Sequence, residues 1–352
     1  MKETLKKYLG KLEGLIDLEW QGKTREVVQR VFNFEKVKEL PYLNLNTRDA
    51  AVLADRDWPS YPYNDAFFNP EKMLLNELAV VFKHVQLRDY HALNIRCNYG
   101  TVILPSILGA KYKLTENSMP WSGHYESSAE IEELVEKGIP LIESGLGKNC
   151  FETAEFYKKT LADYPKLKKA ISIYHPDLQS TFDVAHLIWG HDLLYAMYDC
   201  PERVHKSLSL ITKTYAAFMR KWKKIAEEKN SYTTHWGYYI KGGIFLRDDS
   251  SVMISPAQYD EFVKPYDQAL LNEFGGCIHF CGKGDTFIKS MTESKNLWGI
   301  NTSQPNLNDM PAMIKYCLDK KIVLVGLLEN YIPKNANTGF IAIKQDNYMS
   351  AR

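Results

Sequence analysis

Short apolar runs alternate with longer segments of helical period along most of the chain. A strand that is buried on both faces has a continuous apolar run, whereas a covering helix repeats its apolar residues every three or four positions. The alternation predicts parallel strands joined by helices. The predicted strands are 40–45, 93–97, 170–174, 233–238, 277–281, 297–301, 322–327 and 339–343. The predicted helices include 127–137, 152–164, 201–229, 256–274 and 310–319.

Eight strands alternating with helices predict an α/β fold of the (β/α)8 TIM-barrel type. A doubly wound sheet would use the same elements, but no Gly-x-Gly-x-x-Gly follows the first predicted strand. Residues 1–38 have a helical pattern and are predicted as an N-terminal helical extension packed on a barrel of residues 39–352. Little chain follows the eighth strand, so the pattern predicts a shortened C-terminal end, whose apolar face a homodimer could cover.

The composition is that of a soluble globular protein, with 352 residues, 45% hydrophobic and 25% charged. A formal net charge of +1 gives no global field toward nucleic acid or an anionic membrane. The apolar run 322–328 is far shorter than the roughly 20 residues that a membrane helix needs. The first 20 residues alternate charged and apolar side chains, unlike a signal peptide, so the expected location is cytoplasmic. Six scattered cysteines predict reduced thiols.

Polar and aromatic residues follow the predicted strands, where a barrel carries its chemistry. A pocket at these ends would take a small-molecule substrate, and the candidate substrate-binding residues are Asn98, Tyr99, Gln179, Trp236, Ser303 and Gln304. The candidate catalytic residues are Asp248, His175 and Glu329. Asp248 could act as a general acid or base, His175 could line the site, and Glu329 could orient a substrate or a histidine. Asp248 and Asp249 are adjacent, so in an extended segment they point to opposite sides.

Five motifs then suggest a family. They are NYGTVILPSILGAKY at 98–112, HPDLQSTFDVAHLIWGHDLLYAMYDCPERVHKSL at 175–208, LRDDSSVMISPAQYDEFVKPY at 246–266, CIHFCGKGD at 277–285 and GINTSQPN at 299–306. With these motifs the chain resembles the uroporphyrinogen decarboxylase superfamily over more than half its length, and most of all its corrinoid-dependent methyltransferase branch. The resemblance implies a distorted (β/α)8 barrel.

The sequence departs from the decarboxylases of this superfamily at three places. Gly100 stands where their catalytic aspartate is expected, and residues 40–50 offer one arginine, Arg48, in place of an arginine-rich segment. Gln345 and Asp346 stand where a late histidine is expected. A porphyrinogen with eight carboxylates needs several cations around its pocket. Decarboxylation of uroporphyrinogen or a related acid is therefore the alternative function.

The methyltransferase branch implies a zinc ion held by His279 and Cys281, with a small thiol as the methyl acceptor. Residues two apart on a strand face the same side, so these two side chains would meet in the pocket, with Cys277 one layer deeper. The family's further cysteine after the last strand is missing. The sequence leaves the remaining ligands open among Asp248, Asp249, Glu329, His175 and His235.

The leading expectation is a methyltransferase that moves a methyl group between a methylcorrinoid, carried on a partner corrinoid protein, and a thiol at zinc. A second alternative, beside the decarboxylase, is a non-catalytic barrel that binds a corrinoid or tetrapyrrole.

Overall fold

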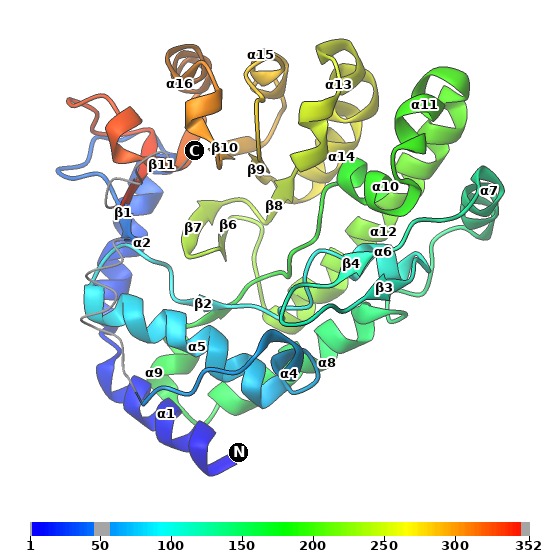
Figure 1. Ribbon diagram of the computed structural model, residues 1–352. Coiled ribbons are helices and arrows are strands. Elements are labelled where there is room, and N and C mark those ends of the chain that lie inside the picture. The colour runs from blue at the N-terminus through cyan, green and yellow to red at the C-terminus, as the bar shows by residue number, and fades with distance from the viewer. Residues whose placement is uncertain (1, 46–56, 346–352) are drawn as a thin grey trace.

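The computed structural model describes residues 2–45 and 57–345. Six parallel strands form one sheet in the order β1-β12-β11-β10-β9-β8, and β2 pairs with β5 in parallel beside it. In Figure 1 helices surround these strands, which is a TIM-like α/β arrangement. The parallel strands are β1 (Tyr42–Asn44), β2 (Asn94–Ile95), β5 (Ser172–Ile173), β8 (Ile244–Arg247), β9 (Gly276–Phe280), β10 (Leu297–Thr302), β11 (Val323–Leu328) and β12 (Phe340–Lys344).

The two sheets do not join into a continuous ladder among the described residues. Between β5 and β8, one bond between backbone groups crosses the gap among the described residues, from the Ser180 N–H to the Arg247 carbonyl, at 3.0 Å. Between β1 and β2, the Tyr90 N–H donates to the Tyr42 carbonyl at 2.9 Å. Isolated bonds in place of ladders leave the ring of strands open at two points.

The fourth predicted strand, 233–238, is correct as one strand only at 233–235, and it is not part of the parallel sheet. These residues form an antiparallel hairpin of β6 (Tyr232–His235) and β7 (Tyr238–Lys241). Its tip is Trp236-Gly237, both with positive φ, of 49° and 79°, as the two-residue turns of tight hairpins require. The hairpin lies in the middle of the ring of strands (Figure 1), and β8 takes the fourth place in the parallel order. Asp248 therefore directly follows a strand.

Helix α2 (Leu18–Phe32) and the hairpin together fill the interior of the sheet. The helix begins at Asp17, whose side chain accepts the Trp20 N–H at 3.0 Å. Its buried face shares an apolar cluster with the hairpin and with the inward side chains of β1, β8, β9, β11 and β12. The predicted helical extension is thus helices α1 (Lys2–Leu15) and α2, and α2 is part of the inner core.

The outer helices follow the predicted pattern closely. Helix α16 (Met310–Asp319) has the predicted bounds, and α7 (Ser128–Lys137) begins at a capping box made by Ser127. The predicted helix 256–274 is broken at Val263 into α13 (Pro256–Phe262) and α14 (Lys264–Phe274). The others are α4 (Tyr63–Phe67), α5 (Pro70–Leu87), α6 (Ile103–Ile107), α8 (Leu146–Leu161), α9 (Pro165–Ala170), α10 (Thr181–Trp189), α11 (Asp192–Asp199), α12 (Pro201–Ala226) and α15 (Ile288–Met291).

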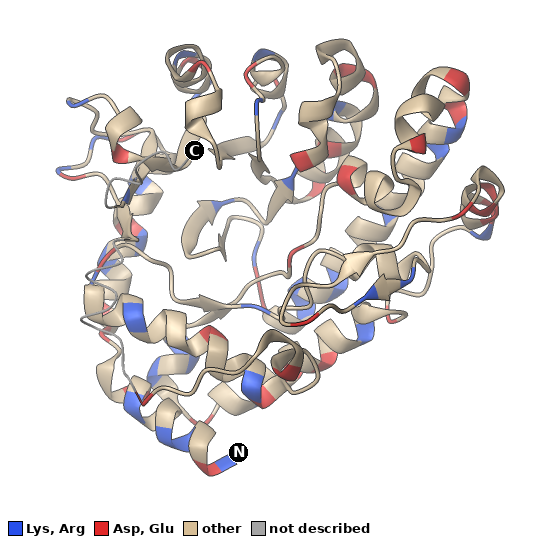
Figure 2. Cartoon of the chain, viewed as in Figure 1, with Lys and Arg blue, Asp and Glu red and all other residues tan. Residues whose placement is uncertain are grey.

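The remaining elements are short. A second hairpin joins β3 (Tyr112–Lys113) to β4 (Trp121–Ser122), and 3-10 turns follow three strands: η1 (Asp249–Met253), η2 (Pro305–Leu307) and η3 (Glu329–Tyr331). Figure 2 shows basic and acidic residues interspersed along the outer helices, in agreement with the net charge of +1. No helix in the described part of the chain is both long and apolar enough to cross a membrane.

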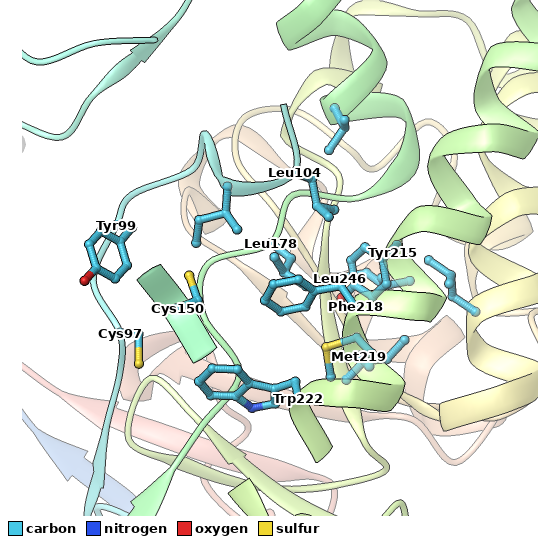
Figure 3. Close-up of a cluster of buried hydrophobic side chains, with 14 of the residues drawn as sticks. Cys97, Tyr99, Leu104, Cys150, Leu178, Tyr215, Phe218, Met219, Trp222 and Leu246 are labelled. Carbon is cyan, nitrogen blue, oxygen red and sulfur yellow. The ribbon is translucent and has the colours of Figure 1, made fainter. Parts of the chain in front are cut away.

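The outer core lies between the helices and the sheet. In Figure 3, Tyr215, Phe218 and Trp222 of α12 gather beside Leu178 and Leu246, and Tyr99 lies near Cys97 and Cys150. The Tyr99 hydroxyl is bonded to the Thr153 hydroxyl at 2.7 Å inside this core. Of the predicted substrate-binding residues, Tyr99 is thus placed as a packing residue.

Candidate metal centre

Asp249, His279 and Cys281 bring three potential metal ligands together. One ligand atom from each lies within 4.8 Å of the others. His279 Nε2 is 3.3 Å from Cys281 Sγ and 3.3 Å from Asp249 Oδ1. Asp249 Oδ1 also accepts the Cys281 N–H at 2.9 Å. The cluster joins the end of β9 to the first residue of η1, directly after β8.

The spacing of His279 and Cys281 places them together as the strand pattern predicts. Within β9, Cys277 belongs to the inner cluster, while Ile278 and Phe280 belong to the outer core. His279 follows the inward parity, and the chain turns at Gly282, whose φ is +89°. All five residues of β9 are buried because both faces of the strand are covered.

Asn301 orients the histidine. It lies beside His279 in the parallel register of β10 and β9. Its Nδ2 donates to the Val325 carbonyl at 2.6 Å, so its Oδ1 faces His279 Nδ1, at 2.5 Å. The Nδ1–H of His279 therefore donates to Asn301, which leaves Nε2 facing Asp249 and Cys281. A second polar partner of this kind is what metal-binding histidines ordinarily have.

Charge favours a cation at this cluster. Burial alone lowers the pKa of His279, but the hydrogen bonds and charges of Asp249 and Cys281 outweigh it and raise the pKa to about 9. Burial raises the pKa of Asp249, but His279 and Cys281 hold it below its usual range overall. Two acidic ligands thus hold positive charge on the imidazole, and a metal ion can take that place.

Asp248 lies on the other side of the strand end. Its carboxylate is fully buried, close to the buried side chains of Asp267 and Ser180. Burial raises the pKa of Asp248 to about 6, and Asp267 is a buried acidic neighbour. The predicted general acid or base is therefore turned away from the three ligands.

A cleft of about 570 Å3 opens beside the cluster. Its lining includes His279, Asn301 and Ser303, and also Trp236 at the hairpin tip. The Trp236 and His279 rings meet edge to face, with centroids 5.0 Å apart. The wider lining consists of Leu43, Leu45, Glu77, Val80, His84, His91, Asn94, Arg96, Tyr174, Gly237, Tyr238, Thr302, Pro305, Gly326, Leu328, Ile343 and Gln345.

Trp236 is fixed by a buried charge network. Asp177 forms ion pairs with Arg96 and Arg247, and Trp236 Nε1 donates to Asp177 at 3.3 Å. The Arg247 guanidinium lies 4.0 Å from the centre of the indole ring. Burial acts against the charge of Asp177, but the two arginines outweigh it and hold its pKa below the usual range. A hydrogen bond and a cation–π contact thus hold the indole that forms part of the cleft wall.

His175 has both ring nitrogens occupied by backbone. Nδ1 donates to the Pro176 carbonyl at 3.0 Å, and Nε2 accepts the Phe245 N–H at 3.1 Å. Burial lowers the pKa of His175 to about 3. The ring joins the turn after β5 to β8, and it has no free nitrogen for proton transfer or for a metal.

The other predicted residues are divided between the cleft and its surroundings. Ser303 lines the cleft, and Gln304 Oε1 accepts the Gly282 N–H at 2.6 Å, which ties down the loop after β9. Glu329 is exposed at the start of η3 and does not line the cleft. Asn98 and Gln179 also lie outside the cleft lining. Arg48 and residues 346–352, on which the predicted shortened C-terminus depends, lie outside the described residues.

For two residues near the site, the pattern of strands in the sequence does not indicate a role. Asn301 is the last residue of a predicted strand and has no predicted role. Its role depends on being paired with His279 in the register of β10 and β9, which the sequence does not specify. His84 in α5 also lines the cleft. Its Nδ1 lies 2.8 Å from Asp89 Oδ2, and its ring stacks on His91 with the centroids 3.8 Å apart.

Comparison with known proteins gives a likeness of fold. A methyltransferase from Methanosarcina mazei superposes with a TM-score of 0.64, over 87% of this chain and 82% of that chain, at 14% sequence identity. At this identity the likeness establishes a shared α/β architecture. No protein-family model matches the sequence, and no curated protein matches it.

Proposed function

We propose that the protein is a methyltransferase that moves a methyl group between a methylcorrinoid and a small thiol at a zinc ion bound by Asp249, His279 and Cys281. The observation that carries the proposal is the convergence of a nitrogen, a sulfur and an oxygen ligand within 4.8 Å. The likeness of fold to a methyltransferase agrees with it.

The three residues fit zinc by chemistry and by spacing. Zinc takes histidine nitrogen, cysteine sulfur and carboxylate oxygen in tetrahedral sites, at about 2.0–2.3 Å. Two ligands of one tetrahedral ion at such distances stand about 3.3–3.8 Å apart. The two distances from His279 Nε2, both 3.3 Å, agree with that range. Three protein ligands leave a fourth position, as in catalytic zinc sites.

Each residue has a defined task. His279 presents Nε2 because Asn301 holds Nδ1–H, and Cys281 and Asp249 supply the negative charges that hold a divalent cation. When bound, zinc lowers the pKa of a thiol and keeps it as a nucleophilic thiolate. The cleft beside His279 accepts the rest of the thiol, against the fixed face of Trp236. A corrinoid protein would present the methyl group from outside the cleft.

The test combines metal content with methyl transfer. Protein purified without added metal is measured by elemental analysis for the wild type, Cys281→Ser and Cys317→Ser. Cys317 is a buried cysteine of α16 away from the three ligands and serves as the matched control. We expect near-stoichiometric zinc in the wild type and the control, and a large loss in Cys281→Ser. Methylcobalamin with a set of small thiols then tests transfer by its absorbance change. A wild type that binds no zinc and takes none up would overturn the proposal.

Decarboxylation of a porphyrinogen has less support. Arg96 is the arginine among the described residues of the cleft lining, and Glu77 and Asp177 already pair with it. Gly100, in place of the expected aspartate, has a φ of +71° and packs against Pro120, where a Cβ would lie 2.9 Å from a ring carbon. Neither position offers the charge that a porphyrinogen needs.

A second candidate uses the same residues without metal. Cys281 Sγ lies 3.3 Å from His279 Nε2, and Asn301 holds the other ring nitrogen, which is the arrangement of a Cys-His-Asn nucleophile. Metal-free protein whose Cys281 reacts rapidly with iodoacetamide, with loss of that reactivity in His279→Gln, would favour this function. Protein with neither zinc nor a reactive thiol would favour the non-catalytic binding barrel.

A further inference from the structure

Helix α10 holds the segment that carries Asp249. Asp183 Oδ2 accepts the Asp249 N–H at 2.8 Å, and Oδ1 accepts the Ser250 N–H at 2.6 Å. One turn further along α10, His186 Nδ1 lies 3.0 Å from the Ser250 hydroxyl. Asp183 and His186 thus bind one dipeptide from one helical face.

This contact replaces a local cap. Asp249 and Ser250 open the 3-10 turn η1, where backbone N–H groups have no partner within the turn. The residue before the turn, Asp248, makes no side-chain cap and points into the core. Asp183 comes from another element and is 1% exposed, so it bonds these two N–H groups out of contact with water.

Asp183 is connected to the ligand cluster through Asp249. The backbone of Asp249 is held by Asp183, while its side chain faces Cys281 and His279. Asp183 is absent from the group of three ligand atoms, and both its oxygens are occupied by backbone. A carboxylate that fixes the backbone of a ligand sets the ligand's position without touching the metal.

We infer that Asp183 is a positioning residue for the metal centre, acting by fixing Asp249 as the third ligand. The inference rests on the proposed zinc site. Partners of this kind change metal affinity by about 10- to 100-fold when they are replaced. We expect that loss in Asp183→Asn, because an amide can accept one of the two N–H groups but turns its own N–H2 toward the other.

The experiment is a double-mutant cycle on zinc affinity. Zinc dissociation constants are measured by competition with a chromophoric chelator for the wild type, Asp183→Asn, Asp249→Asn and the double variant. If Asp183 works through Asp249, its replacement costs about 10- to 100-fold in the wild type and little in the Asp249→Asn background. Asp192→Asn is the matched control, since Asp192 is an exposed aspartate in the first turn of neighbouring α11.

Each outcome has a distinct meaning. Equal loss in both backgrounds, or unchanged affinity in folded Asp183→Asn, overturns the inference and leaves the zinc site standing. A wild type that binds no zinc overturns the proposed function itself. If Asp183→Asn does not fold by circular dichroism, Asp183→Glu tests the same contact, since it keeps both acceptor oxygens but displaces them by one methylene from the Asp249 and Ser250 N–H groups. A zinc affinity that falls in Asp183→Glu but not further in the Asp249→Asn background supports the inference, and an unchanged affinity overturns it.

Discussion

Asp248 and Asp249 are neighbours in the chain, but their carboxylates lie on opposite sides of the end of β8. Asp249 Oδ1 is 3.3 Å from His279 Nε2, in the ligand cluster. Asp248 is fully buried in the outer layer, near Asp267. The division falls where the chain passes from β8 into the 3-10 turn η1, and it makes the two residues a matched pair for experiment.

The first prediction uses this pair. Asp249→Asn removes a charged ligand, and we expect zinc affinity to fall by about 100-fold or more, beyond the loss that a partner outside the ligand set produces. Asp248→Asn makes the same chemical change one residue away, and we expect a change of less than about threefold. Zinc dissociation constants of the two variants, measured by competition with a chelator, test this prediction. Equal losses in the two variants would mean that both act through the fold of η1 and would remove Asp249 from the ligand set.

The second prediction concerns the orientation of His279. Asn301→Ala removes the acceptor of the Nδ1–H, so the imidazole can rotate or change tautomer, and we expect zinc affinity to fall about 10- to 100-fold. Cobalt-substituted protein should show an altered visible spectrum, which reports ligand geometry.

Asn308→Ala is the control for this variant. Asn308 also forms hydrogen bonds close to the site, to the backbone of Gly282 and Gly284, but it does not touch His279. If the two variants bind zinc equally well, Asn301 has no part in orienting the histidine.

The spacing of two of the proposed ligands illustrates what a linear pattern can predict. His279 and Cys281 are two apart at the end of an apolar run, and period-two geometry suffices to bring them together. The choice between Asp248 and Asp249 needs the location of β8, whose four residues follow Gly242-Gly243. The run 233–238 is more strand-like, but its turn at Trp236-Gly237 depends on a positive φ for a tryptophan, which sequence patterns seldom indicate.

The third prediction concerns His175 and pH. Burial lowers its folded-state pKa to about 3, against about 6.5 in the unfolded chain. Below pH 6.5 the unfolded chain binds a proton that the folded protein does not, so this stability is present above pH 6.5 and is lost as pH falls toward 3. The loss is at most about 1.4 kcal/mol per pH unit.

Replacing the histidine removes that dependence. We expect His175→Gln to lower the free energy of unfolding by about 1–3 kcal/mol at pH 7, because one backbone hydrogen bond is lost. The difference from the wild type should shrink between pH 6 and pH 4, as measured by urea unfolding. His235, which is also buried with a lowered pKa, remains in both proteins and preserves part of the slope. Parallel pH profiles would mean that the pKa of His175 is the same in the folded and the unfolded chain. A loss of zinc from His175→Gln would mean that the ring acts in the site.

The last prediction concerns the hairpin that forms one wall of the cleft. Gly237 has a φ of +79°, and a Cβ there would lie 2.3 Å from the ring of His91. Gly237→Ala should therefore lower the free energy of unfolding for two reasons. The positive φ costs about 1–2 kcal/mol for a residue with a Cβ, and displacing His91 costs a further amount. Gly138→Ala separates the two, since Gly138 has a φ of +75° and nothing within 4 Å of a Cβ. We expect the larger loss at Gly237, together with weaker binding of a thiol to the zinc-loaded protein, because the displaced tip carries Trp236 away from His279. Equal losses at the two glycines, with thiol binding unchanged, would mean that the hairpin tip adjusts freely and does not shape the cleft.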